Sequence, residues 1–108
     1  MATAQQVIQY MPKAFDAEEA GDMNAIIVFD LSGEGGGQWS MTIADGNCSV
    51  ADGASEDATA KIIMDAEDYV KMTTGEMNAV AAFMMGQIKV EGDLNTVMKM
   101  QNVFSYDD

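Results

Sequence analysis

The chain has 108 residues, which is enough for one domain with a single core, and its hydrophobic fraction of 48% is typical of a globular protein. It carries five lysines, no arginine and 18 acidic side chains, so its formal net charge is −13. Affinity for nucleic acids comes largely from cations that neutralise phosphates, so this balance argues against a nucleic-acid partner. The average surface should also be repelled by anionic membranes.

The termini and the cysteine content predict a cytoplasmic protein. Cys48 is the only cysteine, so no disulfide can form within the chain and a reducing compartment is expected. The N-terminal stretch lacks the basic and apolar regions of a secretory signal, and the final residues "FSYDD" are not a peroxisomal signal. The longest apolar stretch falls far short of the ~20 residues that a membrane-spanning helix needs.

The first elements are predicted to be helical. Thr3 is a suitable helix cap, and apolar residues follow at helical spacing at Val7, Ile8, Met11 and Phe15. Pro12 lies inside this pattern and predicts a break or a new first turn near Met11. The stretch "DAEEAGDMN" then predicts a short acidic turn of helix that ends at Gly21.

Alternating apolar residues then predict four strands, at 25–31, 38–45, 47–52 and 58–65. The residues expected to face the core are Ile27, Phe29 and Leu31, Trp39, Met41 and Ile43, Cys48 and Val50, and Ala60, Ile62 and Met64. "SGEGGG" predicts a flexible connection, and Asp45-Gly46 is a strong signal for a two-residue hairpin turn. We therefore expect four sequential antiparallel strands.

The second half changes to a helical period. Helices are predicted at 65–75 and 77–86, then a strand at 87–92 with Ile88 and Val90 facing inward, and a last helix capped by Asp93. The apolar positions of the two middle helices are Tyr69 and Met72, and Met77, Val80, Ala81 and Met84; those of the last helix are Leu94, Val97, Met98, Met100, Val103 and Phe104. The last set covers more than one stripe, so this helix needs cover on two sides or faces something outside the chain. The order of elements predicts an α+β fold with helices on one face of a sheet.

Residues suited to catalysis are few. The sequence has no histidine, so the commonest general base and metal ligand is missing, and Cys48 has no histidine to activate it. "DGASED" lacks the spacing of a calcium loop, and "GEGGG" lacks the lysine and the following helix of a phosphate loop. We therefore predict no catalytic residue, no metal and no cofactor. A small cavity enzyme that uses a tuned aspartate, such as Asp30 or Asp65, remains an alternative.

The chain contains 11 methionines, an unusual number. Because methionine is flexible and polarisable, it fills irregular space and suits surfaces that accept varied apolar partners. The methionines therefore indicate either a methionine-rich packed core or an apolar cavity for a flexible ligand. An apolar groove that takes a partner helix is a further alternative.

Three stretches of the sequence are similar to a known protein family: "MPKAFDAEEAGDMNAIIVFDLSG", "QWSMTIADGNCSV" and above all "AFMMGQIKVEGDLNTVMKMQNVF". Together they resemble the sterol-binding domain of the sterol carrier protein type 2 family over nearly the whole chain. The resemblance implies one domain over residues 1–108, with about five mostly antiparallel strands and helices on one face enclosing an apolar tunnel. It also implies non-enzymatic binding and transfer of a sterol, fatty acid, acyl-CoA or phospholipid. We expect a monomer that contacts membranes transiently.

The candidate tunnel-lining residues share an apolar side chain and a predicted inward position. They are Phe29, Trp39, Met41, Ile43, Ile62, Met72, Met77, Val80, Met84, Ile88, Met98 and Phe104. Because the chain has no arginine, no guanidinium can pair with an anionic head group, and a lysine would act only as a point charge.

Overall fold

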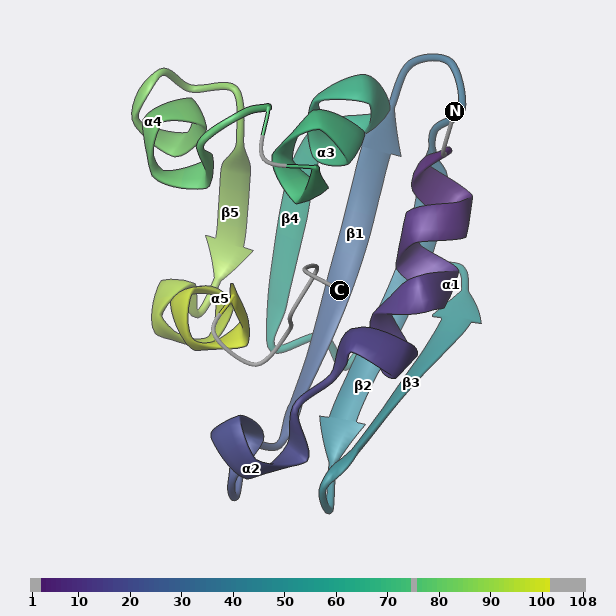
Figure 1. Cartoon of the computed structure of the whole chain (residues 1–108), viewed down its shortest axis with the longest axis vertical. Coiled ribbons are helices and arrows are strands. Elements are labelled where there is room, and N and C mark those ends of the chain that lie inside the picture. Colours follow the sequence, from purple (N-terminus) through teal and green to yellow (C-terminus); the bar gives the residue numbers. More distant parts are fainter. Residues whose placement is uncertain (1–2, 75, 102–108) are drawn as a thin grey trace.

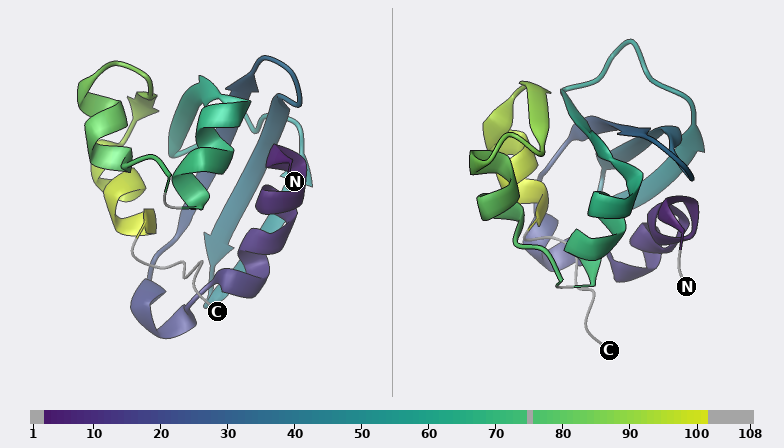
Figure 2. Two further views of the ribbon diagram at one scale, coloured as in Figure 1. Left: turned by 45° about the horizontal axis from the view of Figure 1, so that its top comes forward. Right: turned by 90° about the horizontal axis from the view of Figure 1, so that it is seen from above.

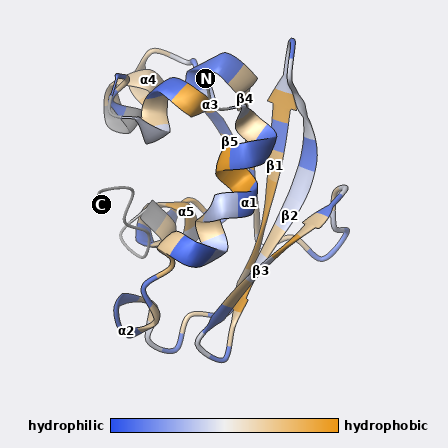
Figure 3. Cartoon of the chain, turned by 45° about the vertical axis from the view of Figure 1, so that its right-hand side comes forward, coloured by the Kyte–Doolittle hydropathy of each residue, from blue (hydrophilic) through white to orange (hydrophobic). Residues whose placement is uncertain are grey.

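The protein is a five-stranded sheet with all its helices on one face, as seen in a computed structural model that describes residues 3–74 and 76–101. Figure 3 views the sheet nearly edge-on and shows the helices together on one side of it. This confirms the predicted α+β class. The elements are α1 (Ala4–Ala14), α2 (Ala17–Ala20), β1 (Ala25–Ser32), β2 (Gly37–Ala44), β3 (Asn47–Asp52), β4 (Ala60–Asp65), α3 (Ala66–Thr73), α4 (Ala79–Met84), β5 (Lys89–Gly92) and α5 (Leu94–Gln101).

Helix α1 begins as predicted but does not break at Met11. Thr3 and Gln6 form a capping box, in which each side chain accepts a hydrogen bond from the other residue's backbone N–H. Pro12 lies inside the helix, which continues to Ala14, so the predicted break is wrong. The proline lies in the last turn, and the N–H that it lacks would have donated back to Ile8, so the helix loses one hydrogen bond without being interrupted. The short helix α2 is capped by Asp16 and ends at Gly21, as expected.

Strands β1 and β2 form the predicted antiparallel hairpin, with Phe29 opposite Trp39. Strand β3 continues the meander through a tight turn at Asp45 and Gly46, whose φ angles are 54° and 77°. Two positive φ angles define the hairpin turn that Asp-Gly favours, so this prediction is confirmed.

Strand β4 departs from the expectation of four sequential antiparallel strands. It pairs parallel to β1, with Phe29 beside Ile62, which gives the sheet order β3-β2-β1-β4-β5. The connection over residues 53–59 arches across the side of the sheet that faces away from the helices (Figure 2, right). The backbone N–H of Thr59 donates to the carbonyl of Ile26 at 2.7 Å and fixes the end of this crossover. Alternation in a sequence shows which side chains share a face, but not the direction in which two strands pair.

Of the remaining elements, α4, β5 and α5 lie at one edge of the sheet. Asp65 caps α3, Asn78 caps α4, and β5 pairs antiparallel with β4. The Asp93 carboxylate accepts backbone hydrogen bonds from Asn95 at 3.0 Å and from Thr96 at 3.4 Å, which confirms its predicted role as the cap of α5.

Helix α4 buries a different face from the one that its sequence periodicity predicts. Ala82 is buried, whereas Ala81 and Met84, which share the predicted apolar face, are exposed. Helix α5 buries Val97 and Met100 and leaves Leu94 and Met98 on the surface. The edge formed by α4, β5 and α5 is therefore less completely packed than the rest of the molecule.

Candidate functional site

The inner face of the sheet is a continuous apolar layer. The strand registers place Trp39, Phe29, Ile62 and Val90 side by side in one row that crosses four strands. A second row runs through Val50, Met41, Ile27 and Ala60. Most of these side chains are buried, and Val50 and Val90 are partly buried and packed against the core. The strand alternation that was read from the sequence therefore produces one wide apolar surface.

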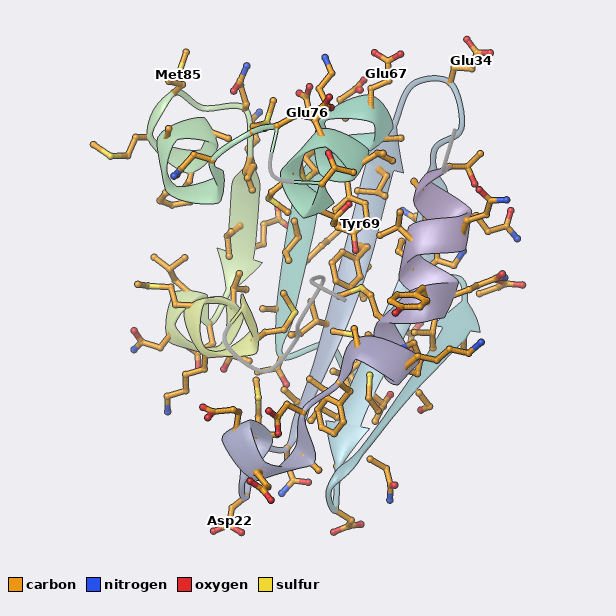
Figure 4. All side chains as sticks on the ribbon, viewed as in Figure 1. Asp22, Glu34, Glu67, Tyr69, Glu76 and Met85 are labelled. Atoms are coloured by element: carbon orange, nitrogen blue, oxygen red, sulfur yellow. The ribbon has the colours of Figure 1, made fainter. Side chains whose placement is uncertain are left out.

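Helices α1 and α3 cover this surface with further apolar side chains. The Tyr69 ring on α3 packs edge-to-face on Phe29, with ring centroids 5.6 Å apart. The Tyr69 hydroxyl donates a hydrogen bond to the Met11 sulfur of α1, with an oxygen-to-sulfur distance of 2.9 Å. Tyr69 thus joins the two helices above the centre of the sheet (Figure 4).

Polar groups near the sheet belong largely to its other face. Ser40, the buried polar residue among those described, follows Trp39 and so points away from the helices. Its hydroxyl donates to the carbonyl of Gly53 in the crossover at 2.6 Å. Lys61 and Asp30 form an ion pair at 3.6 Å on the same outer face. The layer between sheet and helices is therefore suited to apolar contact and poorly suited to acid–base chemistry.

The structure gives the twelve candidate residues different environments. Six of them, Phe29, Trp39, Met41, Ile43, Ile62 and Ile88, are buried; Met72 and Met77 are partly buried and packed against the core; Met84 and Met98 are exposed. The side chain of Val80 and the whole of Phe104 lie outside the described residues. The tunnel and its lining by these residues stay predictions.

Other members of the buried layer were not among the candidates. Met11, Met64, Tyr69, Val97 and Met100 are buried in the same core cluster. Their helical or strand spacing was visible in the sequence, and it marks them as core residues. Nothing in the spacing distinguishes a residue that packs on protein from one that contacts a ligand.

Among the clefts that described residues line, two lie away from the predicted lining. One of about 560 Å³ lies between the start of α1, the β1–β2 turn and α3, with Glu34, Glu67 and Glu76 on its wall. The labelled side chains of Figure 4 place these three glutamates at the same end of the molecule. The other cleft, of about 530 Å³, lies between α2 and α5. Neither cleft is lined by any of the twelve candidates.

The titratable groups provide little catalytic chemistry. Partial burial raises the pKa of Cys48 to about 11, so its thiol stays protonated at neutral pH and is a weak nucleophile. Hydrogen bonds from Thr96 lower the pKa of Asp93, which therefore remains an ionised helix cap. Within the described part of the chain, no group of three His, Cys, Asp or Glu side chains is arranged to hold a metal ion. Nor is any described helix both long and apolar enough to cross a membrane.

Residues 5–105 match the SCP-2 sterol transfer family, and the chain belongs to that family. Hydroxysteroid dehydrogenase-like protein 2 of Xenopus tropicalis is 31% identical over 100 residues, which cover 92% of this chain and 24% of the relative. The chain thus spans about a quarter of that protein's length.

Among the solved structures that share the fold are two sterol carrier proteins. The apo form of sterol carrier protein 2 from Yarrowia lipolytica is 27% identical, with a TM-score of 0.63, and the match covers 81% of this chain and 71% of that one. Sterol carrier protein-2 of Aedes aegypti, solved in complex with the C16 fatty acid palmitate, is 14% identical, with a TM-score of 0.68 over 100% of both chains. The family resemblance that the sequence indicated is confirmed.

Proposed function

We propose that this domain is a non-enzymatic carrier that binds a long apolar lipid, with a fatty acid as the first candidate, between the inner face of the sheet and the helices. It acts as a monomeric domain over residues 1–108 in the cytoplasm. In this proposal the ligand's chain contacts the buried and partly buried candidate lining residues, and the ligand is delivered unchanged.

The observation that carries this proposal is the continuous apolar layer. All five strands contribute to the two side-by-side rows of apolar residues, and α1 and α3 add apolar side chains above them. Each methylene of a ligand chain that is transferred into such surroundings gains about 0.8 kcal/mol. Flexible methionines in the layer, such as Met41 and Met64, suit ligands of variable shape.

The relatives support a long-chain ligand. The Aedes aegypti protein with this fold was solved with palmitate. A 16-carbon chain with a small polar head fits a layer whose polar groups are few, because only the head needs contact with water. Since this chain has no arginine, the head should remain near the surface, where water can solvate it.

The side chains that could perform catalysis have other roles. Asp16, Asp65 and Asp93 accept hydrogen bonds at helix N-termini, and Asp30 pairs with Lys61. Together with the protonated Cys48 and the absence of histidine from the sequence, this favours a carrier over a cavity enzyme.

Native mass spectrometry of the gently purified protein tests the proposal, combined with uptake of a fluorescent fatty acid. We expect a co-purifying lipid mass or saturable one-to-one uptake. Met72→Gln should weaken uptake, because Met72 packs against the core from α3, whereas Glu67→Gln on the exposed side of the same helix should not. A clean apo mass with no fatty acid uptake would contradict the carrier proposal.

A further inference from the structure

The exposed large apolar side chains are concentrated on one edge of the molecule. Among the described residues they are Phe83, Met84, Met85, Leu94 and Met98, which we call the α4–α5 edge, and one outlier, Tyr10. Met84 is 80% exposed, Met85 74% and Met98 58%. Figures 1 and 2 show α4 and α5 together at the β5 side of the sheet, and Figure 4 shows Met85 projecting outward at the end of α4. Exposed apolar side chains gathered in one region of a protein surface often mark a site of contact with another molecule or a membrane.

The charge of this edge differs from that of the rest of the chain. Residues 77–101 carry two lysines, Lys89 and Lys99, and two carboxylates, Glu91 and Asp93, so this stretch has no net charge. The whole chain carries −13, and all of that excess therefore lies outside the stretch. An apolar surface without net charge can approach a neutral partner without electrostatic cost.

The packing of α5 explains why these side chains are exposed. Val97 and Met100 are buried against the molecule, while Leu94 and Met98 face outward from the same helix. The sequence of this helix indicates apolar residues on more than one of its faces. No described residue packs over the face that carries Leu94 and Met98 closely enough to bury it.

We propose that the α4–α5 edge docks on the surface of a neutral, zwitterionic phospholipid bilayer. Exposed Phe, Met and Leu side chains enter the boundary between head groups and acyl chains, as on interfacial helices. A second copy of the chain is a poorer occupant, because two molecules of charge −13 repel each other, whereas a zwitterionic bilayer has no net charge. This inference goes beyond the carrier proposal, since docking requires only surface side chains and no internal ligand.

Flotation with phosphatidylcholine vesicles tests the docking. We expect the wild-type protein to float with the vesicles at both low and high salt. The double substitution Met84→Ser with Met85→Ser should reduce the bound fraction on the order of tenfold, because the apolar contact is lost. The matched control is Tyr10→Ser, which changes an exposed apolar side chain on α1 and should leave binding unchanged.

Methionine oxidation by hydrogen peroxide identifies what covers the edge. Met84 and Met85 should oxidise quickly in buffer and be protected by phosphatidylcholine vesicles, while Met41, which is buried, stays slow in both conditions. Protection without vesicles at low protein concentration would mean that the chain covers its own edge, and protection that grows with protein concentration would mean a second copy. Either result, or flotation that Tyr10→Ser reduces as much as the double substitution, would overturn the inference.

The two proposals can fail separately. Fatty acid uptake measured in buffer without vesicles tests only the carrier proposal, and Met85→Ser alone, at an exposed residue outside the candidate lining, should leave it intact. Absence of wild-type flotation would overturn the docking proposal alone.

Discussion

The two halves of this domain use the same kinds of side chain in opposite ways. In the half built from β1, β2, α1 and α3, Phe29 and Met41 are buried within strands of eight residues. At the α4–α5 edge, a four-residue strand and two short helices leave Phe83 and Met84 exposed. Apolar side chains in the first half stabilise the fold, and those at the edge are available for contact with other molecules.

This difference follows from the length of the helices and strands and from how completely neighbouring elements pack over their apolar side chains. Long strands pair along their whole length, so each inner side chain has neighbours on both adjacent strands and helices above it. Short edge elements have fewer neighbours, and their apolar side chains stay at the surface. A lipid carrier needs both conditions, because a stable scaffold must adjoin a region that can meet a membrane.

The largest expected effect comes from a matched pair of phenylalanine substitutions. Phe29→Ala should lower the free energy of unfolding by about 3–5 kcal/mol, because the ring is buried between Trp39 and Ile62 and contacts Tyr69. Phe83→Ala at the edge should lower it by about 1 kcal/mol or less. Urea unfolding followed by circular dichroism measures both. Equal losses would abolish the distinction between the two halves.

A methionine pair sharpens the same contrast. Met41→Ala should cost about 2–5 kcal/mol, since Met41 has no exposed surface. Met84→Ala should change stability by about 0.5 kcal/mol or less, because 80% of Met84 is exposed. Thermal melts of both variants provide the measurement. A core-sized loss for Met84→Ala would show that this methionine packs against protein in solution.

Two glycine substitutions compare a position that packs against the 53–59 crossover with a position in the open turn after α4. Gly86 and Gly92 both have positive φ angles, 81° and 89°, so alanine at either site costs about 1–2 kcal/mol. A Cβ at Gly92 would also come within 2.5 Å of the Thr59 carbonyl oxygen, whereas one at Gly86 meets nothing nearby. Gly92→Ala should therefore destabilise the protein clearly more than Gly86→Ala in urea melts. A reversed order would mean that β5 is not held against the crossover.

The smallest effect concerns the cap of α5. Thr96 donates to the Asp93 carboxylate at 2.9 Å and holds the pKa of that group below its ordinary value of 3.8. The ionised carboxylate therefore contributes its full stabilisation when the pH is above the pKa that Asp93 has in the unfolded chain. This stabilisation is lost as the pH falls through the lower pKa that Asp93 has in the folded protein. Asp93→Asn should thus lower the Tm slightly at pH 7 and not below that pKa. A side-chain titration by NMR that places Asp93 at or above 3.8 would contradict this cause.

The order of the elements could be predicted from the sequence because it depends on local patterns. Asp45-Gly46 defines its turn through backbone preferences, and alternation at Trp39, Met41 and Ile43 defines an inner face. The parallel pairing of β4 with β1 could not be predicted, since it depends on the path of the crossover. The break predicted at Pro12 does not occur, and the sequence pattern could not show this because it does not show where in the helix a proline lies.

The candidate site could be predicted only as a set of apolar residues. Met41 and Met84 follow equally good periodic patterns, yet one is buried and the other exposed. The difference depends on which neighbouring element covers each residue, and this is a property of the assembled fold. For the same reason, the sequence could indicate an excess of apolar surface on the last helix without showing which side chains remain uncovered.

The central claim is that a fatty acid enters the layer between sheet and helices, and the methionine methyl groups report on it directly. The measurement is an NMR titration of the protein, labelled with carbon-13 at its methionine methyls, with palmitate in buffer without vesicles. We expect saturable one-to-one shifts at the buried or partly buried Met41, Met64 and Met72, together with contacts between their methyls and the ligand chain. Shifts confined to the exposed Met84 and Met85, or no saturable shift at any methionine, would contradict the account.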